Sequence, residues 1–117
     1  MESLDDCQIH YVESVEDAQQ FMRWLGERRA WLACDTETGG LSPYKDALRL
    51  IQFGDTQTGG AMRCDPWAGV AIEALKQYQG HLVFQNAKFD QQFIELNAGE
   101  KLIPWYRTHD TRVMAHL

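Results

Sequence analysis

The chain has 117 residues, a formal net charge of −6 and 44% hydrophobic residues. This length predicts one domain with its own core, and the longest apolar run, Ala30 to Cys34, is too short to span a bilayer. The negative charge disfavours a broad basic surface for nucleic acid, unless acids gather in a site that cations neutralise. The acidic N-terminus lacks signal-peptide features, and three cysteines without a C-x-x-C pair favour a reducing compartment, so we expect a cytoplasmic protein with no membrane partner.

The first half of the chain predicts one helix among four strands. Ser14 is a favourable N-cap for a helix, with acids in its first turn and apolar residues at helical spacing after it. Alternating or apolar runs separated by glycine and proline turns predict the strands. The expected helix covers residues 15–28, and the expected strands cover residues 8–12, 30–37, 48–53 and 61–64.

The second half alternates between helix and strand. Asp65-Pro66 begins a helix that Gly80 ends, a short β-forming run covers residues 81–85, and residues 86–97 form the next helix. Thr108 to Leu117 predicts a final helix, with Thr108 or Asp110 as its cap. An antiparallel three-strand meander followed by this alternation indicates an α/β fold, in which a mixed sheet carries helices on its faces.

The stretch Trp31 to Leu41 carries the clearest chemical signal. Its apolar residues occur on both strand faces, which predicts burial on both sides of the sheet. Asp35 and Glu37 are two residues apart, so their carboxylates share one face of the strand and repel each other unless a proton or a cation intervenes. Gly39 and Gly40 then allow a sharp turn or a close approach to a ligand. The stretch is typical of half a metal site.

A third acid lies on the helix predicted for residues 86–97. Asn86 and Asp90 are four residues apart and share a helix face, beside a stripe of apolar side chains that would seat the helix on the sheet. Such carboxylates suit Mg²⁺ or Mn²⁺, and two such ions can hold the attacking and leaving oxygens of a phosphodiester. Taken singly, each acid is more often a solvated surface residue.

Two ordered motifs resemble the proofreading 3′–5′ exonuclease domain of family A DNA polymerases, which belongs to the DnaQ-like (DEDD) exonucleases. The segment Asp35-Thr-Glu-Thr-Gly-Gly-Leu41 matches the family's D-x-E motif, and Gln85-Asn-Ala-Lys-Phe-Asp90 matches its N-x-x-(F/Y)-D motif. The segment from His109 to Met114 resembles the D-T helix start that follows in these enzymes. The resemblance covers essentially the whole chain and implies an RNase H-like mixed sheet, a meander plus a parallel strand, flanked by helices.

The resemblance also implies roles for particular residues. Asp35, Glu37 and Asp90 would be the catalytic acids and the ligands of two Mg²⁺ or Mn²⁺ ions, with Asp35 bridging both. Thr38 and Leu41 lie where the family contacts the terminal nucleotide, Leu41 as an apolar wedge between bases.

Two further substrate contacts are implied by the second motif. Gln85 and Asn86 lie where the family contacts the strand near its 3′ end.

The resemblance further implies a fourth acid on a later helix, with a tyrosine or histidine a few residues before it, as in Y-x-x-x-D. We expect this chain to end before that motif, because Asp110 comes too early and is interpreted as a helix cap. Residues 1–117 are therefore expected to form one incomplete, C-terminally truncated domain with weak or absent activity of its own. The leading hypothesis is the exonuclease region of a bacterial or phage DNA polymerase I-type enzyme, which binds a single-stranded DNA 3′ end and the remainder of the polymerase, with self-association through surface exposed by truncation. The alternatives are an RNase D-like exoribonuclease and a non-catalytic docking module.

Overall fold

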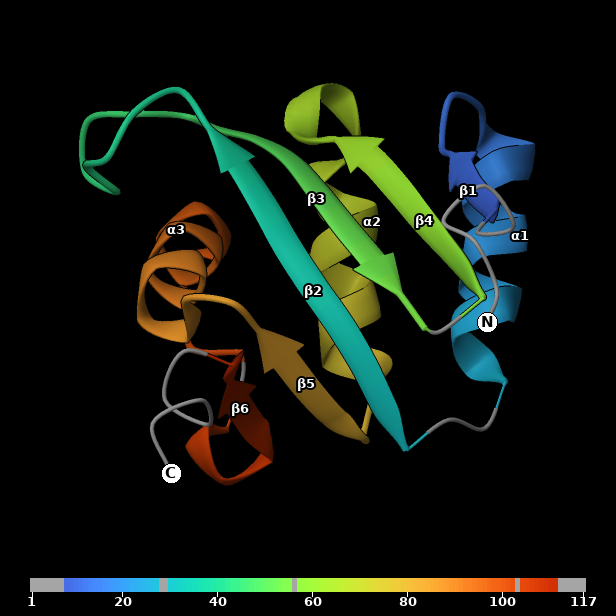
Figure 1. Cartoon of the computed structure of the whole chain (residues 1–117). Helices are drawn as coiled ribbons and strands as arrows, with labels where there is room; N and C mark the ends of the chain where they lie inside the picture. The colour runs from blue at the N-terminus through green and yellow to red at the C-terminus, as the bar shows by residue number, and fades with distance from the viewer. Residues whose placement is uncertain (1–7, 28–29, 56, 103, 112–117) are drawn as a thin grey trace.

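The structure is a computed structural model that describes residues 8–27, 30–55, 57–102 and 104–111. A six-stranded sheet runs through it in the strand order β1-β4-β3-β2-β5-β6 (Figure 1). The elements in chain order are β1 (Gln8–Tyr11), α1 (Val15–Gly26), β2 (Trp31–Thr38), β3 (Leu48–Gly54), β4 (Thr58–Arg63), α2 (Cys64–Gln77), β5 (His81–Phe84), α3 (Ala87–Ala98), the 3-10 turn η2 (Trp105–Arg107) and β6 (Thr108–Asp110).

The centre of the sheet is the predicted meander. Strand β3 pairs antiparallel with both β2 and β4, and β5 pairs parallel with the other edge of β2. The predicted α/β class and mixed sheet are thereby confirmed. Two parallel pairings extend the sheet beyond the prediction, because β1 lies beside β4 and β6 lies beside β5.

Local sequence accounts for the helix ends. The hydroxyl of Ser14 accepts a hydrogen bond of 3.1 Å from the backbone N–H of Asp17, as expected of an N-cap. Helix α3 ends at Gly99, whose φ of 76° is the left-handed conformation that glycine adopts without a Cβ penalty. No helix in the described part of the chain combines the length and the apolar character that crossing a membrane requires.

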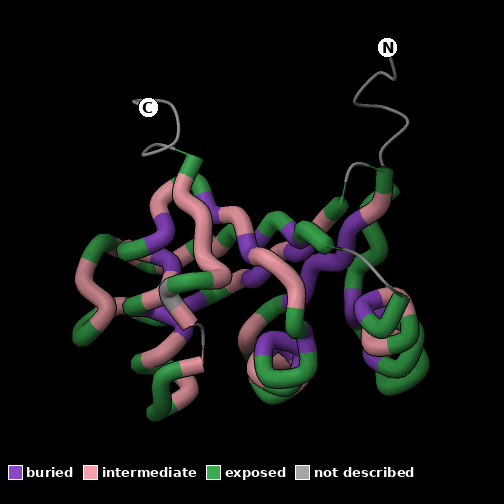
Figure 2. The backbone as a smooth tube through the Cα atoms, turned by 90° about the horizontal axis from the view of Figure 1, so that it is seen from below, coloured by how far each residue is buried: buried purple, intermediate pink, exposed green. Residues whose placement is uncertain are grey.

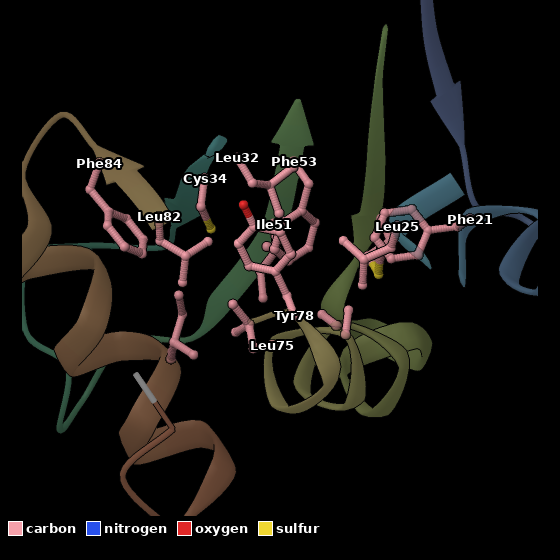
Figure 3. Close-up of a cluster of buried hydrophobic side chains, with 14 of the residues drawn as sticks. Phe21, Leu25, Leu32, Cys34, Ile51, Phe53, Leu75, Tyr78, Leu82 and Phe84 are labelled. Carbon is pink, nitrogen blue, oxygen red and sulfur yellow. The ribbon is translucent and has the colours of Figure 1, made fainter. Parts of the chain in front are cut away.

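The core lies between the sheet and the helices. Figure 2 shows the buried residues along the layer where strands meet helices, and Figure 3 shows α2 and α3 on the same side of the strands. Leu75 of α2 and Ile94 of α3 are 2% and 0% exposed, and they belong to the same hydrophobic cluster as Leu32, Ile51 and Leu82 of the strands. Burial of these side chains fixes each helix against the sheet, at about 25 cal/mol per Å² of apolar surface removed from water.

The prediction that β2 is buried on both sides is wrong for the described residues. Leu32 and Cys34 face the helices and are buried, whereas Ala33 is exposed and Trp31 is 49% exposed. The helices in the described part of the chain pack on one side of β2, so apolar residues on its other face have no helix over them. Trp31 instead stacks on His81 of the neighbouring strand, with ring centroids 4.7 Å apart.

The helix predicted from Thr108 is also wrong at its start. Residues 108–110 form β6, in register with β5 through pairs such as Phe84 with Asp110. The edge of β5 offers these three residues backbone hydrogen bonds on one side, and this pairing outweighs a helix that starts at Thr108. Helical backbone begins at Thr111, and the rest of the predicted helix lies outside the described residues.

Candidate functional site

Strand β2 presents Asp35 and Glu37 on the face of the sheet that is opposite the helices. Residues along β2 alternate between buried and exposed up to Asp35, and Asp35 and Glu37 are both exposed. The predicted same-face relation of the two carboxylates is therefore confirmed. A shift in the pairing with β3 occurs directly after Glu37, where the strand leads into the Gly39-Gly40 turn.

Helix α3 brings Asp90 to the same end of the sheet. Phe93 and Ile94 are 2% and 0% exposed and anchor the helix on the core. Asp90, one turn earlier, is the buried charged residue of the described chain, with 4% of its surface exposed. Its Oδ1 accepts a short hydrogen bond from the hydroxyl of Thr36, the residue between Asp35 and Glu37. The two sequence motifs are thus joined directly, from strand to helix.

Asp35 and Asp90 line one pocket of about 360 Å³ together with Gln85 and Asn86. This pocket lies where the parallel strands β2 and β5 end, the edge at which α/β sheets gather ligands. Thr36 and Phe89 complete its lining. Four of the seven predicted site residues therefore meet here.

The other three predicted residues do not line this pocket. Glu37 lies on the same face as Asp35, two residues further along β2. The hydroxyl of Thr38 donates a hydrogen bond of 2.6 Å to the carbonyl oxygen of Gly40, so it stabilises the turn. Leu41 is 85% exposed in the following loop.

The electrostatics of the pocket favour a cation. The pKa of Asp90 is raised to about 6. Burial is the largest cause, the hydrogen bond from Thr36 acts in the opposite direction, and the negative charges of Asp35 and Asp110 add to the increase. A divalent cation beside Asp35 and Asp90 would relieve this repulsion, and their oxygens are the hard ligands that Mg²⁺ and Mn²⁺ prefer. The donor set therefore fits such an ion.

The predicted set of three acids is not assembled. Among residues 8–27, 30–55, 57–102 and 104–111, no three His, Cys, Asp or Glu side chains lie close enough together to hold one metal ion. The structure pairs Asp35 with Asp90 and leaves Glu37 outside their pocket. Cys34 adds no ligand, because burial and then the charges of Asp90 and Asp35 raise the pKa of its thiol well above its usual value.

Two residues near the site were not predicted to serve it. Nothing in the sequence around Thr36 predicted its contact with Asp90. Strand alternation predicts only that Thr36 lies on the opposite face from Asp35 and Glu37, which is the face that the helices cover. Asp110 is predicted as the cap of its own helix, and it directly precedes the helical backbone that begins at Thr111, but the rest of that helix lies outside the described residues. The structure adds a contact that the sequence did not predict. The Oδ2 of Asp110 accepts a hydrogen bond of 2.9 Å from the backbone N–H of Ala87, the first residue of α3. Contacts between segments distant in sequence leave no local pattern that would reveal such a partner.

Tyr106 and Asp110 have the Y-x-x-x-D spacing that the fourth acid of the family would show. In the structure, however, Tyr106 belongs to the 3-10 turn η2 and Asp110 to strand β6, so the two residues do not share a helix face. Asp110 does not line the pocket of Asp35 and Asp90. The spacing therefore does not supply the missing acid.

Comparison with solved structures shows the fold. The catalytic core of RRP6 from Trypanosoma brucei matches with a TM-score of 0.76 and 20% identity, over 96% of this chain and 31% of that one. NrnC from Brucella melitensis, solved with bound Mg²⁺, matches with a TM-score of 0.64 and 18% identity, over 93% of this chain and 50% of that one. RNase D from Trypanosoma brucei, in complex with RNA U12, matches with a TM-score of 0.74 and 13% identity, over 93% of this chain and 39% of that one.

These structures share an RNase H-like exonuclease fold with the chain. The chain spans half or less of the length of each of the three. A search of curated proteins found no match. A family model described as 3′–5′ exonuclease matches residues 9–117. Because that match includes nearly every residue and both acidic motifs, the chain belongs to the 3′–5′ exonuclease family.

Proposed function

We propose that this chain carries part of the active site of a nuclease that removes nucleotides from 3′ ends by hydrolysing phosphodiester bonds. The observation that carries the proposal is the meeting of Asp35 and Asp90 with Gln85 and Asn86 in one pocket. The carboxylates come from separate motifs, and the amides stand beside them at the end of β5. Ligands for a cation and hydrogen-bonding groups for a nucleotide are thereby placed side by side.

Each side chain has a role that follows from its contacts. Asp35 and Asp90 supply oxygen ligands, and the hydroxyl of Thr36 holds the carboxylate of Asp90 in place. When divalent ions are bound, they activate water and neutralise the charge that develops on the phosphate. Gln85 and Asn86 offer amide donors and acceptors to the sugar-phosphate backbone near the scissile bond.

Glu37 is the third of the proposed acids, and it lies on the face of the sheet opposite the helices. It lies two residues beyond Asp35 on the same strand face, so both carboxylates face the solvent from which a substrate approaches. Leu41, in the exposed loop after β2, is proposed to contact the terminal base, and Thr38 to set the path of that loop through its bond to Gly40.

We infer DNA as the substrate from the motifs, which resemble those of polymerase proofreading domains, and place the chain in a polymerase I-type protein. RNA is the second candidate. One of the matched structures is an RNase D in complex with RNA, and this observation favours an exoribonuclease. The two candidates differ in whether the protein accepts the ribose 2′-hydroxyl.

The test measures metal binding and hydrolysis separately. Isothermal titration with Mn²⁺ is compared for the unchanged chain, Asp35→Asn and Asp90→Asn, because these changes remove charge and preserve shape. The variants are expected to bind Mn²⁺ at least about tenfold more weakly. Oligonucleotides of one sequence, as DNA and as RNA with a 5′ label, then show whether products shorten from the 3′ end in the presence of Mg²⁺ and which sugar is preferred.

Glu16→Gln is the matched control, because Glu16 is an exposed acid on α1 and outside the pocket. It should bind Mn²⁺ as the unchanged chain does. Slow hydrolysis that both Asp35→Asn and Asp90→Asn abolish would support the proposal. Absence of Mn²⁺ binding to the unchanged chain would contradict it and favour a non-catalytic module.

A further inference from the structure

The N-terminus of α3 lacks the cap that its sequence offers. Asn86 occupies the N-cap position, and asparagine is among the best residues there. Its backbone φ and ψ are −140° and 80°, and its side chain makes no capping hydrogen bond. The amide of Asn86 instead lines the pocket that holds Asp35 and Asp90.

Asp110 supplies the cap from another element. Its Oδ2 accepts a hydrogen bond of 2.9 Å from the N–H of Ala87, the first residue of α3. The negative carboxylate lies at the positive end of the helix dipole, which strengthens this contact. Strand β6 sets the position of Asp110, because Asp110 is paired in register with Phe84 of β5.

A second contact joins the same two elements. The side-chain amide of Gln91 donates a hydrogen bond of 2.9 Å to the hydroxyl of Thr108. Thr108 and Asp110 are two residues apart on β6 and face the same side of the sheet. Strand β6 therefore holds the N-terminal part of α3 at two points, Ala87 in the first turn and Gln91 directly after it. Asp90 lies between these two points, and its backbone N–H donates to the carbonyl oxygen of Asn86 at 3.1 Å.

We propose that Asp110 is a positioning residue: it caps α3 in place of Asn86, which fixes where Asp90 stands and leaves the amide of Asn86 available to the pocket. The inference rests on the proposed function for the roles of Asp90 and Asn86. The inference assigns the D-T segment, which follows the second motif, a role in the site. That role depends on the contact between Ala87 and Asp110, which are 23 positions apart in sequence.

A double-mutant cycle between Asp110→Ala and Asn86→Ala tests the capping exchange without reference to metal. In the unchanged chain, Asn86→Ala should alter the unfolding equilibrium constant by less than about twofold, because this side chain does not cap. Asp110→Ala should raise that constant about fivefold, the usual effect of losing a cap. In the Asp110→Ala background, where Asn86 can turn back to cap the helix, Asn86→Ala should cost about fivefold more.

Two variants of β6 separate positioning from general strand stability. Asp110→Asn keeps an oxygen acceptor and should keep the Ala87 amide protected from hydrogen exchange within about threefold, whereas Asp110→Ala should lose that protection about fivefold or more. His109→Gln is the matched control, because its bond of 2.9 Å runs to His81 and not to α3. It should leave exchange at Ala87 unchanged.

Mn²⁺ titration of the same variants links the cap to the pocket. Asp110→Ala should weaken Mn²⁺ binding about tenfold, as loss of a group that orients a ligand commonly does, and Asp110→Asn should restore most of the affinity. Equal effects of Asn86→Ala in both backgrounds, or unchanged Ala87 exchange in Asp110→Ala, would overturn the inference. Lack of Mn²⁺ binding to the unchanged chain would overturn only the proposed function, since the cycle and the exchange rates remain readable.

Discussion

At the scale of single residues, Asp90 is the most constrained acid in the site. It is 4% exposed, it accepts a hydrogen bond from Thr36, and it lies close enough to Asp35 and Asp110 for their charges to raise its pKa. A buried carboxylate with a single neutral donor and like charges nearby is costly to keep ionised. The protein accepts this cost at one place, which is the pattern expected of a functional site.

The stability of the chain should therefore rise as the pH falls from 7 towards 5. The folded-state pKa of Asp90 is about 6, above the value of about 3.9 for an unfolded aspartate, so the folded state binds the proton first. Between these two values the folded state carries more protons than the unfolded state, and the free energy of unfolding increases as the pH decreases. We expect Asp90→Asn to remove this component and to stabilise the chain at pH 7 by about 1 to 2 kcal/mol.

Urea unfolding at pH 5, 6 and 7 measures both effects. Glu16→Gln serves as the comparison, because Glu16 is exposed on α1, and it should keep the pH dependence of the unchanged chain. The same pH dependence in Asp90→Asn would contradict the assignment of the raised pKa to Asp90.

Gly60 is required by close packing. A Cβ built there would lie 2.6 Å from Cδ1 of Phe21, whose ring is buried against Phe53 with centroids 5.5 Å apart. We expect Gly60→Ala to destabilise the chain by about 1 to 3 kcal/mol, as overpacking does. A Cβ at Gly69 on α2 would meet no atom within 4 Å beyond its chain neighbours and the adjacent backbone of its own helix, so Gly69→Ala should be neutral or stabilising by up to about 1 kcal/mol. Thermal unfolding of the pair measures the contrast, and equal losses would show that Phe21 moves freely.

At the scale of elements, α3 connects the core to the site. Ile94 is fully buried on the sheet side of α3, one turn after Asp90. Replacing it with alanine removes packing that seats the helix, so Ile94→Ala should cost about 2 to 5 kcal/mol. Gln92→Ala, at an exposed position of the same helix, should cost less than about 0.5 kcal/mol.

Chemical denaturation with Mn²⁺ titration checks the consequence for the site. Where Ile94→Ala remains folded, its Mn²⁺ affinity should fall, because the helix no longer fixes Asp90 against Thr36. Unchanged affinity in a variant that lost several kcal/mol would show that the seating of α3 does not determine the pocket.

The helices and strands also show which features cannot be predicted from local sequence patterns. The order strand, helix, meander, helix, strand, helix was predicted from periodicity, because each element has an apolar face of its own. Strand β6 was not, since Thr-His-Asp carries no strand pattern and pairs only because β5 offers an edge. Asp110, predicted as a cap for the helix that follows it, is also found to accept a hydrogen bond from the first residue of the preceding helix α3.

At the scale of the whole molecule, the charge and the sheet decide how a substrate can bind. The net charge is −6, and the face of β2 that carries Asp35 and Glu37 is exposed. Binding of an oligonucleotide should therefore depend on divalent ions far more than on lysine and arginine contacts. The expected self-association through exposed surface and the single-domain boundary stay predictions.

Fluorescence anisotropy with a single-stranded oligonucleotide measures this dependence. In the presence of Mn²⁺, raising the salt from 50 to 200 mM should weaken binding less than about tenfold, because few phosphates are neutralised by side chains. Removing the ion with a chelator should abolish binding. A loss of about 10³-fold with salt would instead indicate many cationic phosphate contacts and contradict the proposed mode of binding.

The sequence alone determined the shared face of Asp35 and Glu37, the meander and the helix that carries Asp90, because two-residue and four-residue spacings are local geometry. Only the tertiary structure decided that Asp90 pairs with Thr36, that Glu37 stays outside the pocket and that Asp110 caps α3. These contacts join residues that are far apart in the chain. Burial and the packing of α3 select them, and neither leaves a periodic trace in the sequence.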